Sequence, residues 1–292
     1  MATRPVPNVV RLLDDATARI ASALGLERRE ARLEAHVLAS SALKVTRAWL
    51  IAHDQDVPTP VQADSIETLV ARRAQGEPVA YILGEKEFYG RLFKVTPDVL
   101  IPRPETELLV DTALQHLPEK TPCNILDLGS GSGAVAITLA LERPLAEVVA
   151  IETSAAALSI TQDNALHLGA ENVHCIEGNW YAGLRVKKFD MIVSNPPYVA
   201  AADSHLDAGD LRFEPRQALA SGEDGLDDLR VIIAGAPAHL VDHGWLFVEH
   251  GYDQSAEVGE LLRQHGFGQT CSLRDLAGLG RVSGGCWPNK VD

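Results

Sequence analysis

Residues 124–133 read Asn-Ile-Leu-Asp-Leu-Gly-Ser-Gly-Ser-Gly, a short apolar run followed by a loop of alternating glycine and serine. The apolar run predicts a buried strand, and the apolar residues at 134–142 predict a helix that begins directly after the loop. Glycines at a strand-to-helix turn let the backbone approach a ligand closely. The stretch therefore predicts a nucleotide-binding turn made of Gly129, Ser130, Gly131, Ser132 and Gly133.

A second predicted strand, residues 147–151, leads into Glu152, which follows the last glycine of the loop by 19 residues. A carboxylate at this strand end can accept hydrogen bonds from both hydroxyl groups of a ribose. The spacing does not decide which nucleotide binds, because Gly129, Gly131 and Ala134 also satisfy the dinucleotide fingerprint. Both nucleotide classes remain open at this point.

Strands and helices alternate along the rest of the chain, with further predicted strands at residues 173–176, 189–194, 244–249, 268–273 and 280–286. This alternation predicts an α/β fold with a doubly wound, Rossmann-like sheet that binds ligands at the carboxyl ends of its strands. The glycine loop, Glu152, Trp180 and Asn195 all follow predicted strands, so we expect them at one edge. An adenine could stack or lie edge-on against Trp180, although an aromatic residue there is equally typical of a core.

The strand at residues 189–194 ends in Asn195-Pro196-Pro197-Tyr198. A residue before proline is pushed out of the helical region, so Asn195 should project its carboxamide from the strand end. Proline has no N–H, which leaves the Pro196 carbonyl with little local competition for its lone pairs. The turn therefore offers two hydrogen-bond acceptors beside the aromatic face of Tyr198, a cradle for a planar group that carries an NH2.

Such a cradle suits methyl transfer to a planar nitrogen. The lone pair of an amide or aromatic amine is delocalised, and hydrogen bonds accepted from both N–H groups favour the pyramidal, reactive geometry. Asn-Pro alone is a common turn starter. The full turn after an apolar strand resembles the signature of enzymes that use S-adenosylmethionine to methylate nucleobase amines or side-chain amides.

Residues 1–84 predict a small helical bundle, because apolar residues recur at helical spacing in the segments 8–24, 27–43, 46–51 and 59–73. These helices carry no obvious catalytic group, so we expect a substrate-docking domain, with a stabilising appendage as the alternative. Two β-rich runs around Tyr89-Gly90 predict a hairpin linker over residues 85–100. Residues 101–292 would then form the catalytic domain.

The chain has 26 basic and 40 acidic side chains and a net charge of −14, of which residues 1–85 contribute only −1. An acidic catalytic domain argues against direct binding of nucleic acid and favours a protein partner. No apolar run reaches the roughly 18 residues of a membrane span, no signal peptide is recognisable, and the four cysteines lack metal or disulfide spacing. We expect a cytoplasmic protein without a metal site, since His239 and His243 on a predicted helix at 226–240 lack a third ligand.

Several motifs together resemble the HemK-type (PrmC) peptide chain release factor glutamine methyltransferases over nearly the whole chain. The specific parts are residues 80–84 (AYILG), 88–90 (FYG) and 101–107 (IPRPETE), joined by 127–133 (DLGSGSG), 195–198 (NPPY), 213–215 (FEP) and 249–251 (EHG). The resemblance implies S-adenosylmethionine as cofactor. It also implies methylation of the glutamine side-chain amide in the Gly-Gly-Gln motif of class I peptide chain release factors.

By position in these motifs, the resemblance implies that the glycine loop packs against the methionine end of the cofactor, that Glu152 holds the ribose and that Trp180 lies at the adenine. Asn195 and Pro196 would accept hydrogen bonds from the substrate NH2, within the rigid turn that Pro197 completes, and Tyr198 would lie against the substrate side chain. The chain departs from the family at two positions. Glu152 stands where aspartate is common, and Asn179 precedes Trp180 where aspartate is usual. Both changes keep hydrogen-bonding capacity and bear on cofactor affinity more than on activity.

Three alternatives differ in function class. A nucleic-acid adenine amino-methyltransferase would use the same turn on a flipped base, but the net acidity and the lack of a basic recognition domain count against it. A nicotinamide-dependent oxidoreductase would use the glycine loop and gives no reason for the Asn195 turn. A helical adaptor with a degenerate catalytic domain conflicts with the intact motifs.

Overall fold

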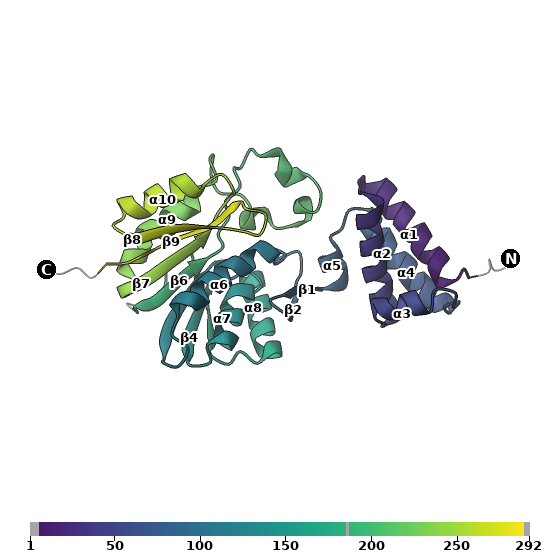
Figure 1. The fold of residues 1–292 in the computed structure, drawn as a ribbon, viewed down its shortest axis with the longest axis horizontal. Helices are drawn as coiled ribbons and strands as arrows, with labels where there is room; N and C mark the ends of the chain where they lie inside the picture. The colour runs from purple at the N-terminus through teal and green to yellow at the C-terminus, as the bar shows by residue number, and fades with distance from the viewer. Residues whose placement is uncertain (1–5, 185–186, 289–292) are drawn as a thin grey trace. The chain divides into compact units, whose positions relative to one another are not determined.

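The computed structural model describes residues 6–184 and 187–288. Its chain divides into two compact units. The N-terminal unit is the described part of Met1–Gly84 together with Asp207–Phe213, and the catalytic unit is the described part of Glu85–Leu206 and Glu214–Asp292. Figure 1 traces the chain through both.

The N-terminal unit is a bundle of helices, as the spacing of its apolar residues predicts. The helices are α1 (Val9–Leu24), α2 (Arg28–Leu43), α3 (Arg47–Ala52), α4 (Pro60–Ala74) and α5 (Val79–Leu83). All five contribute aliphatic side chains to one core. Gly25 ends α1 in the left-handed conformation with a φ of 68°, and Thr59 begins α4 with a capping box to Gln62.

A buried cation explains why the N-terminal unit includes a segment from much later in the chain. The Arg73 side chain is 4% exposed and binds both Glu34 and Asp210 at 2.8 Å. It also donates to two backbone carbonyl oxygens. Because a buried charge is costly unless it is paired and hydrogen-bonded, Asp210 stabilises this guanidinium from 137 residues further along the chain. Residues 207–213 belong to the N-terminal unit for this reason.

The catalytic unit is built on a sheet whose described strands number seven, in the order β5-β4-β3-β6-β7-β9-β8. The strands are β3 (Cys123–Leu128), β4 (Ala146–Glu152), β5 (Val173–Glu177), β6 (Phe189–Ser194), β7 (Leu240–Glu249), β8 (Gly268–Arg274) and β9 (Gly280–Cys286). The first five are parallel, and β9 runs antiparallel to β7 and β8. The chain order reverses at β3, between β4 and β6, and such a switch point opens a crevice at the carboxyl ends of the strands. The predicted doubly wound fold is confirmed.

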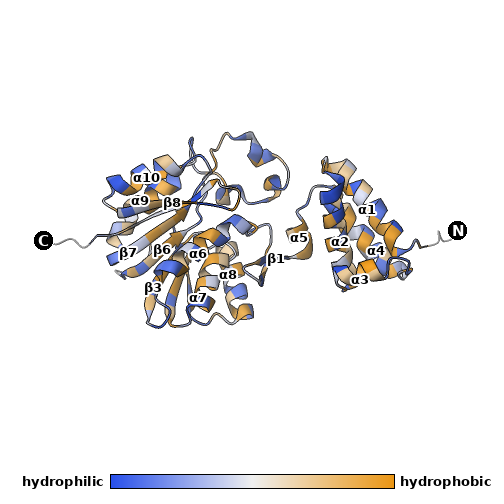
Figure 2. Ribbon diagram, in the orientation of Figure 1, coloured by the Kyte–Doolittle hydropathy of each residue, from blue (hydrophilic) through white to orange (hydrophobic). Residues whose placement is uncertain are grey.

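Helices cover both faces of this sheet (Figure 1). One face carries α6 (Glu107–His116), α7 (Ala134–Glu142) and α8 (Ala155–Leu168), and the other carries α9 (Asp227–Gly235) and α10 (Ser255–Gln264). Alternate residues of one strand serve the two faces, so that Ile125 packs with α6 and α7 whereas Leu126 packs with α9. The central strands in Figure 2 are therefore mostly hydrophobic, as a parallel sheet covered on both faces requires.

The predicted hairpin is present as β1 (Glu85–Phe88) and β2 (Arg91–Lys94). Tyr89 and Gly90 form its turn with φ values of 52° and 74°, a combination that matches the twist of paired strands. We expected this hairpin to be a separate linker, but it belongs to the catalytic unit. The physical reason is that Phe88 and Phe93 are buried in the same core as α6 and α7.

The helix predicted at residues 226–240 is shorter than expected. It ends at Gly235, a single 3-10 turn follows at Ala236–Ala238, and β7 begins at Leu240. Pro237 has no N–H to continue the helical ladder. His239 and His243 thus share no helix. The described residues contain no group of three or more His, Cys, Asp or Glu placed to hold a metal ion, and no described helix is both long and apolar enough to cross a bilayer.

Candidate functional site

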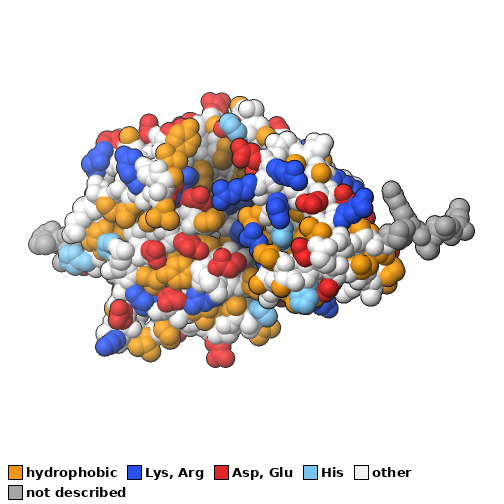
Figure 3. Space-filling view, turned by 45° about the vertical axis from the view of Figure 1, so that its right-hand side comes forward, with side chains coloured by type: hydrophobic (Ala, Val, Ile, Leu, Met, Phe, Trp, Pro, Cys, Tyr) orange, Lys and Arg blue, Asp and Glu red, His pale blue; other side chains and the backbone are white. Residues whose placement is uncertain are grey.

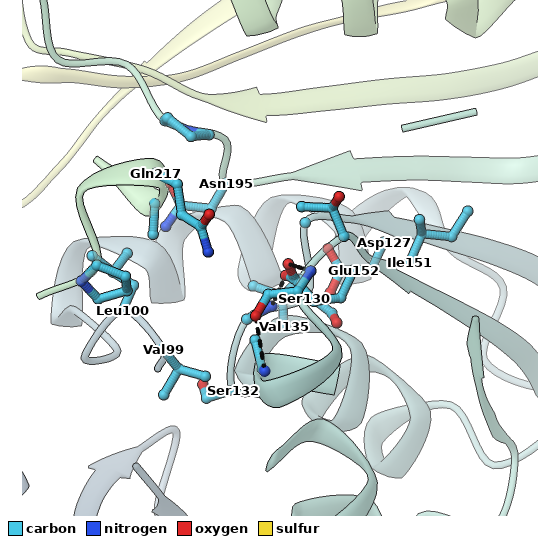
Figure 4. Close-up of a pocket in the computed structure, with 18 of the residues that line it drawn as sticks. Val99, Leu100, Asp127, Ser130, Ser132, Val135, Ile151, Glu152, Asn195 and Gln217 are labelled. Carbon is cyan, nitrogen blue, oxygen red and sulfur yellow. Dashed lines mark hydrogen bonds between the residues drawn. The ribbon is translucent and has the colours of Figure 1, made fainter. Parts of the chain in front are cut away.

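A pocket with a volume of about 310 Å³ opens at the carboxyl ends of β3, β4 and β6. Figure 4 shows Asn195 and Gln217 side by side at one end of it, and Asp127 and Glu152 at the other. All of the lining residues belong to the catalytic unit. The pocket therefore lies at the switch point that the strand order creates.

The glycine loop, residues 129–133, has a backbone that other residues rarely adopt. The φ values of Gly129, Gly131 and Gly133 are 77°, 57° and 83°. A Cβ on Gly133 would lie 2.7 Å from Ile137 and 2.9 Å from Thr161, closer than carbon atoms approach. Gly133 thus allows the loop to pack on its helices, and it does not line the pocket, whereas the other four residues of the loop do.

Side chains of α8 hold the glycine loop in place. Thr161 donates its hydroxyl to the Gly131 carbonyl at 2.9 Å, and Asn164 donates to the Ser132 carbonyl at 2.8 Å. The Ser130 hydroxyl lies 3.2 Å from that of Thr161. The loop is consequently fixed by the protein itself before any ligand binds.

Asp127 caps the N-terminus of α7. Gly133 stands at the N-cap and offers no side chain, and the Asp127 carboxyl accepts from the Ala136 N–H at 3.1 Å instead. The Asp127 side chain is buried, and burial raises its pKa to about 7, with the Ala136 hydrogen bond acting in the opposite direction and the charge of Glu152 adding to the rise. Asp127 thus lines the pocket as a carboxyl group that protonates near neutral pH.

Glu152 ends β4 and faces the pocket. Its two oxygens accept from the backbone N–H groups of Gly131 and Ser154, each at 2.9 Å. The carboxylate therefore ties the glycine loop to the segment after β4. Each oxygen keeps a further lone pair, so this bracing is compatible with the ribose contact that the sequence predicts.

Trp180 lies on the glycine loop and in the core at the same time. A Cβ on Gly129 would come within 3.3 Å of the indole ring, a tight contact, and the φ of 77° there independently favours glycine. The ring lines the pocket and also packs against the hydrophobic cluster on the α9 side of the sheet. The core interpretation of Trp180 is thus confirmed, and its contact with an adenine stays a prediction.

Asn195 lines the pocket directly after β6. Its Nδ2 donates to the Thr106 hydroxyl at 3.2 Å. Its Oδ1 is buried and has no hydrogen-bond partner among residues 6–184 and 187–288. A buried acceptor without a donor costs about 1–3 kcal/mol, so the carboxamide carries an acceptor that a ligand can satisfy.

Tyr198 directs its hydroxyl to Glu249 at the end of β7, with an Oη–Oε1 distance of 3.1 Å. Burial and the neighbouring Glu249 charge raise the pKa of Tyr198, so the phenol stays protonated and donates. Burial also raises the pKa of Glu249 to about 7, against the effect of the Thr106 and Tyr198 hydroxyls. The sequence predicts Tyr198 and Pro196 at the substrate, but of the turn only Asn195 and Pro197 are among the pocket-lining residues.

Two distant segments form the wall opposite the glycine loop. The Glu214 side chain is completely buried, accepts from the Ile101 N–H at 3.0 Å and forms an ion pair with Arg103. This contact joins residues 113 positions apart. It fixes Leu100 and Gln217, on either side of the joint, in the pocket wall.

Thr106 and Gln217 line the pocket although the sequence did not mark them as site residues. Thr106 stands inside the motif at residues 101–107, which supported the family resemblance without indicating a role for this hydroxyl. Gln217 lies in a long loop without periodicity, which offers no sequence signal.

The electrostatic character of the pocket is acidic. Its described lining residues include Asp127, Glu152 and Asp228 and contain neither lysine nor arginine. A diphosphate would be repelled by such a lining, whereas a cationic ligand would be attracted. The dinucleotide interpretation of the glycine loop is disfavoured by this charge pattern.

Comparison with known proteins agrees with this geometry. Residues 105–224 match the methyltransferase small domain, and residues 11–84 match the PrmC N-terminal domain. A release factor glutamine methyltransferase from Bordetella pertussis is 52% identical over 87% of this chain and 94% of its own, and one from Xylella fastidiosa is 47% identical over 97% and 99%. A methyltransferase structure from Pyrococcus furiosus shares the fold, with a TM-score of 0.52 and 16% identity over 75% of this chain and 97% of its own. The chain belongs to the release factor glutamine methyltransferase family.

Proposed function

We propose that this enzyme transfers a methyl group from S-adenosylmethionine to the side-chain amide nitrogen of the glutamine in the Gly-Gly-Gln motif of class I peptide chain release factors. The observation that carries the proposal is the buried, unpartnered Oδ1 of Asn195 at the pocket wall. An amide NH2 is a donor that can satisfy such an acceptor. The family to which the chain belongs supports the same substrate.

The lining residues of the pocket support S-adenosylmethionine as the cofactor. The glycine loop would receive the methionine end, Glu152 the ribose hydroxyls and Trp180 the adenine. The acidic lining suits a ligand that carries a positive sulfonium and an ammonium group, and it does not suit the diphosphate of a nicotinamide cofactor.

Catalysis would rest on positioning. The cofactor supplies a methyl group already activated by its positive sulfur. Asn195 Oδ1 and the Pro196 carbonyl would accept the two N–H groups of the substrate amide, which orients the nitrogen and favours its pyramidal form. No general base is assigned, because the proton of the methylated amide can leave to water.

The helical N-terminal unit would dock the release factor, and the enzyme would act in the cytoplasm, where its substrate works. Leu33 and Val37 lie one turn apart on α2 and are 48% and 37% exposed. Their joint replacement by serine should raise the KM for the release factor several-fold while leaving cofactor affinity unchanged. Leu166→Ser on α8, at a position 85% exposed, is the matched control, and an equal KM change there would contradict docking by the helical unit.

An adenine amino-methyltransferase would need to attract a polyanion. The chain has a net charge of −14, and acidic and basic side chains are interspersed over the face drawn in Figure 3. Nonspecific attraction to a phosphate backbone requires a basic surface, so the protein substrate is the better match.

The decisive experiment follows a labelled methyl group from S-adenosylmethionine to three acceptors: a purified release factor, the same factor with its Gly-Gly-Gln glutamine replaced, and duplex DNA. We expect label on the intact factor alone. Label on DNA, or equal label on both forms of the factor, would overturn the proposal.

A further inference from the structure

Thr106 places a buried hydroxyl between the Asn195 turn and the end of β7. The residue is 3% exposed, lines the pocket, and accepts a hydrogen bond from Asn195 Nδ2 at 3.2 Å. A threonine hydroxyl has acceptor lone pairs but only one hydrogen. It can hold the asparagine NH2 only when that hydrogen points elsewhere.

The carboxyl group of Glu249 lies near this hydroxyl, and the hydroxyl acts to lower the pKa of Glu249. Glu249 is 1% exposed, and its Oε1 already receives the Tyr198 hydroxyl. The other oxygen, Oε2, is buried and has no hydrogen-bond partner within the described part of the chain. Among charged groups, Arg281 favours the ionised carboxylate and lowers the pKa of Glu249, whereas Glu105 opposes ionisation and raises it.

The direction of these hydrogen bonds decides what Asn195 presents to the pocket. A carboxamide can offer either its oxygen or its NH2 to a ligand. Turned over, Asn195 would accept from Thr106 and direct its NH2 at the NH2 of a substrate amide, donor against donor. That reversed state needs the single hydrogen of Thr106, for which the unpaired Oε2 of Glu249 would compete.

We propose that Thr106 and Glu249 are positioning residues that hold the Asn195 carboxamide with its oxygen toward the substrate nitrogen. The inference rests on the proposed function for the identity of that nitrogen. In the proposed relay, Asn195 Nδ2 donates to Thr106 and Thr106 donates to Glu249, whose Oε1 also accepts from the Tyr198 hydroxyl. Neither residue touches the reacting atoms, so both act through Asn195.

The test compares Thr106→Val, which keeps the shape and removes the hydroxyl, with Thr106→Ser, which keeps the hydroxyl. Loss of one orienting hydrogen bond should lower kcat of Thr106→Val for release-factor methylation about tenfold. KM for the factor and the Kd for S-adenosylhomocysteine should stay within about twofold, because no binding contact is removed. Thr106→Ser should recover most of kcat.

A matched control separates positioning from general loss of a buried hydroxyl. Thr112 lies in α6, is 1% exposed, and its hydroxyl donates to the Leu108 carbonyl of its own helix at 2.7 Å. Thr112→Val should leave kcat unchanged. If Thr112→Val and Thr106→Val reduce kcat equally, or if Thr106→Val leaves kcat intact, the proposal is wrong.

The second arm tests the relay. Glu249→Gln can return a donor to Thr106, so kcat should fall, and the double variant with Thr106→Val should be no worse than the poorer single variant because the two residues act in series. Independent, multiplicative losses would overturn the relay.

A spectroscopic readout does not depend on the substrate. The side-chain NH2 signal of Asn195, identified by its absence in Asn195→Asp, should exchange slowly with water in the wild type and rapidly in Thr106→Val. Unchanged exchange would overturn the positioning role. Failure of the wild type to methylate any release factor would instead overturn the proposed function while this readout stands.

Discussion

The two halves of the pocket treat their polar groups in opposite ways. On the cofactor half, Glu152 accepts from the N–H groups of Gly131 and Ser154, and α8 side chains donate to the carbonyls of Gly131 and Ser132. On the acceptor half, Asn195 Oδ1 is buried and has no hydrogen-bond donor among the described residues.

This difference matches the ligands that the two halves would receive. A cofactor present in every cycle is served by a preformed seat, which loses little entropy on binding. A substrate amide that must be held at one angle is served by an unpaired acceptor, because that acceptor gains most from the correct partner and nothing from a wrong one. Four measurements test the comparison.

The largest effect should follow Asn195→Ala, which removes the unpaired acceptor. Loss of one preorganised hydrogen-bonding group at a reacting centre costs on the order of 10²- to 10³-fold in kcat, about 3–4 kcal/mol. The Kd for S-adenosylhomocysteine, measured by calorimetry, should change about threefold at most. Comparable losses in kcat and in S-adenosylhomocysteine affinity would contradict the separation into a cofactor half and an acceptor half.

The next effect concerns the rigidity of the cofactor half. Gly133→Ala places a methyl group against Ile137 and Thr161 at a φ of 83° and should cost about 3 kcal/mol of unfolding free energy. Gly169→Ala is the matched control, since Gly169 ends α8 at a φ of 73° with no atom within 4 Å, and it should cost about 1 kcal/mol. Equal destabilisation in a denaturant titration would show that packing behind the loop contributes nothing.

The acceptor half should make stability depend on pH. Glu249 has a folded-state pKa of about 7, above its unfolded value, so the folded state binds the extra proton and its stability falls as pH rises. Between about pH 5.5 and about pH 7 this carboxyl should remove about 1.5 kcal/mol of unfolding free energy. Glu249→Gln should lose that contribution, while Asp127 keeps its own in both proteins. Parallel stability curves for the two proteins would contradict the raised pKa.

The smallest effect should come from Glu152→Gln. The new NH2 would face a backbone N–H of Gly131 or Ser154 and would weaken both the loop brace and the ribose contact, lowering S-adenosylhomocysteine affinity about tenfold, or about 1.4 kcal/mol. Glu177→Gln, at the exposed end of the neighbouring strand and in register with Glu152, should bind normally. Equal S-adenosylhomocysteine affinity of the two variants would mean that Glu152 does not contribute to cofactor binding.

Local patterns predicted the parts of this molecule that depend on neighbours in sequence. The strand and glycine loop at residues 124–133, the turn at Tyr89-Gly90 and the projection of Asn195 all follow from spacing, φ preferences and proline geometry.

Contacts between distant residues were beyond such reasoning. Thr106 meets Asn195 across 89 residues and Glu214 meets Ile101 across 113, and no periodicity encodes either meeting. The direction of the Tyr198 hydroxyl depends on Glu249 in the same way. Sequence therefore located the pocket and its main acceptor, whereas the groups that orient this acceptor required the fold.

The partnership of Arg73 with Asp210 also bears on how this protein can be dissected or recombined. Because residues 207–213 complete the N-terminal unit, that unit is discontinuous in sequence although it looks like a simple N-terminal extension. A fragment cut at residue 84 would carry its buried guanidinium with one of its two carboxylates missing. A chimera that exchanges helical bundles between relatives would need to exchange this seven-residue segment as well, so the module is inherited as two pieces.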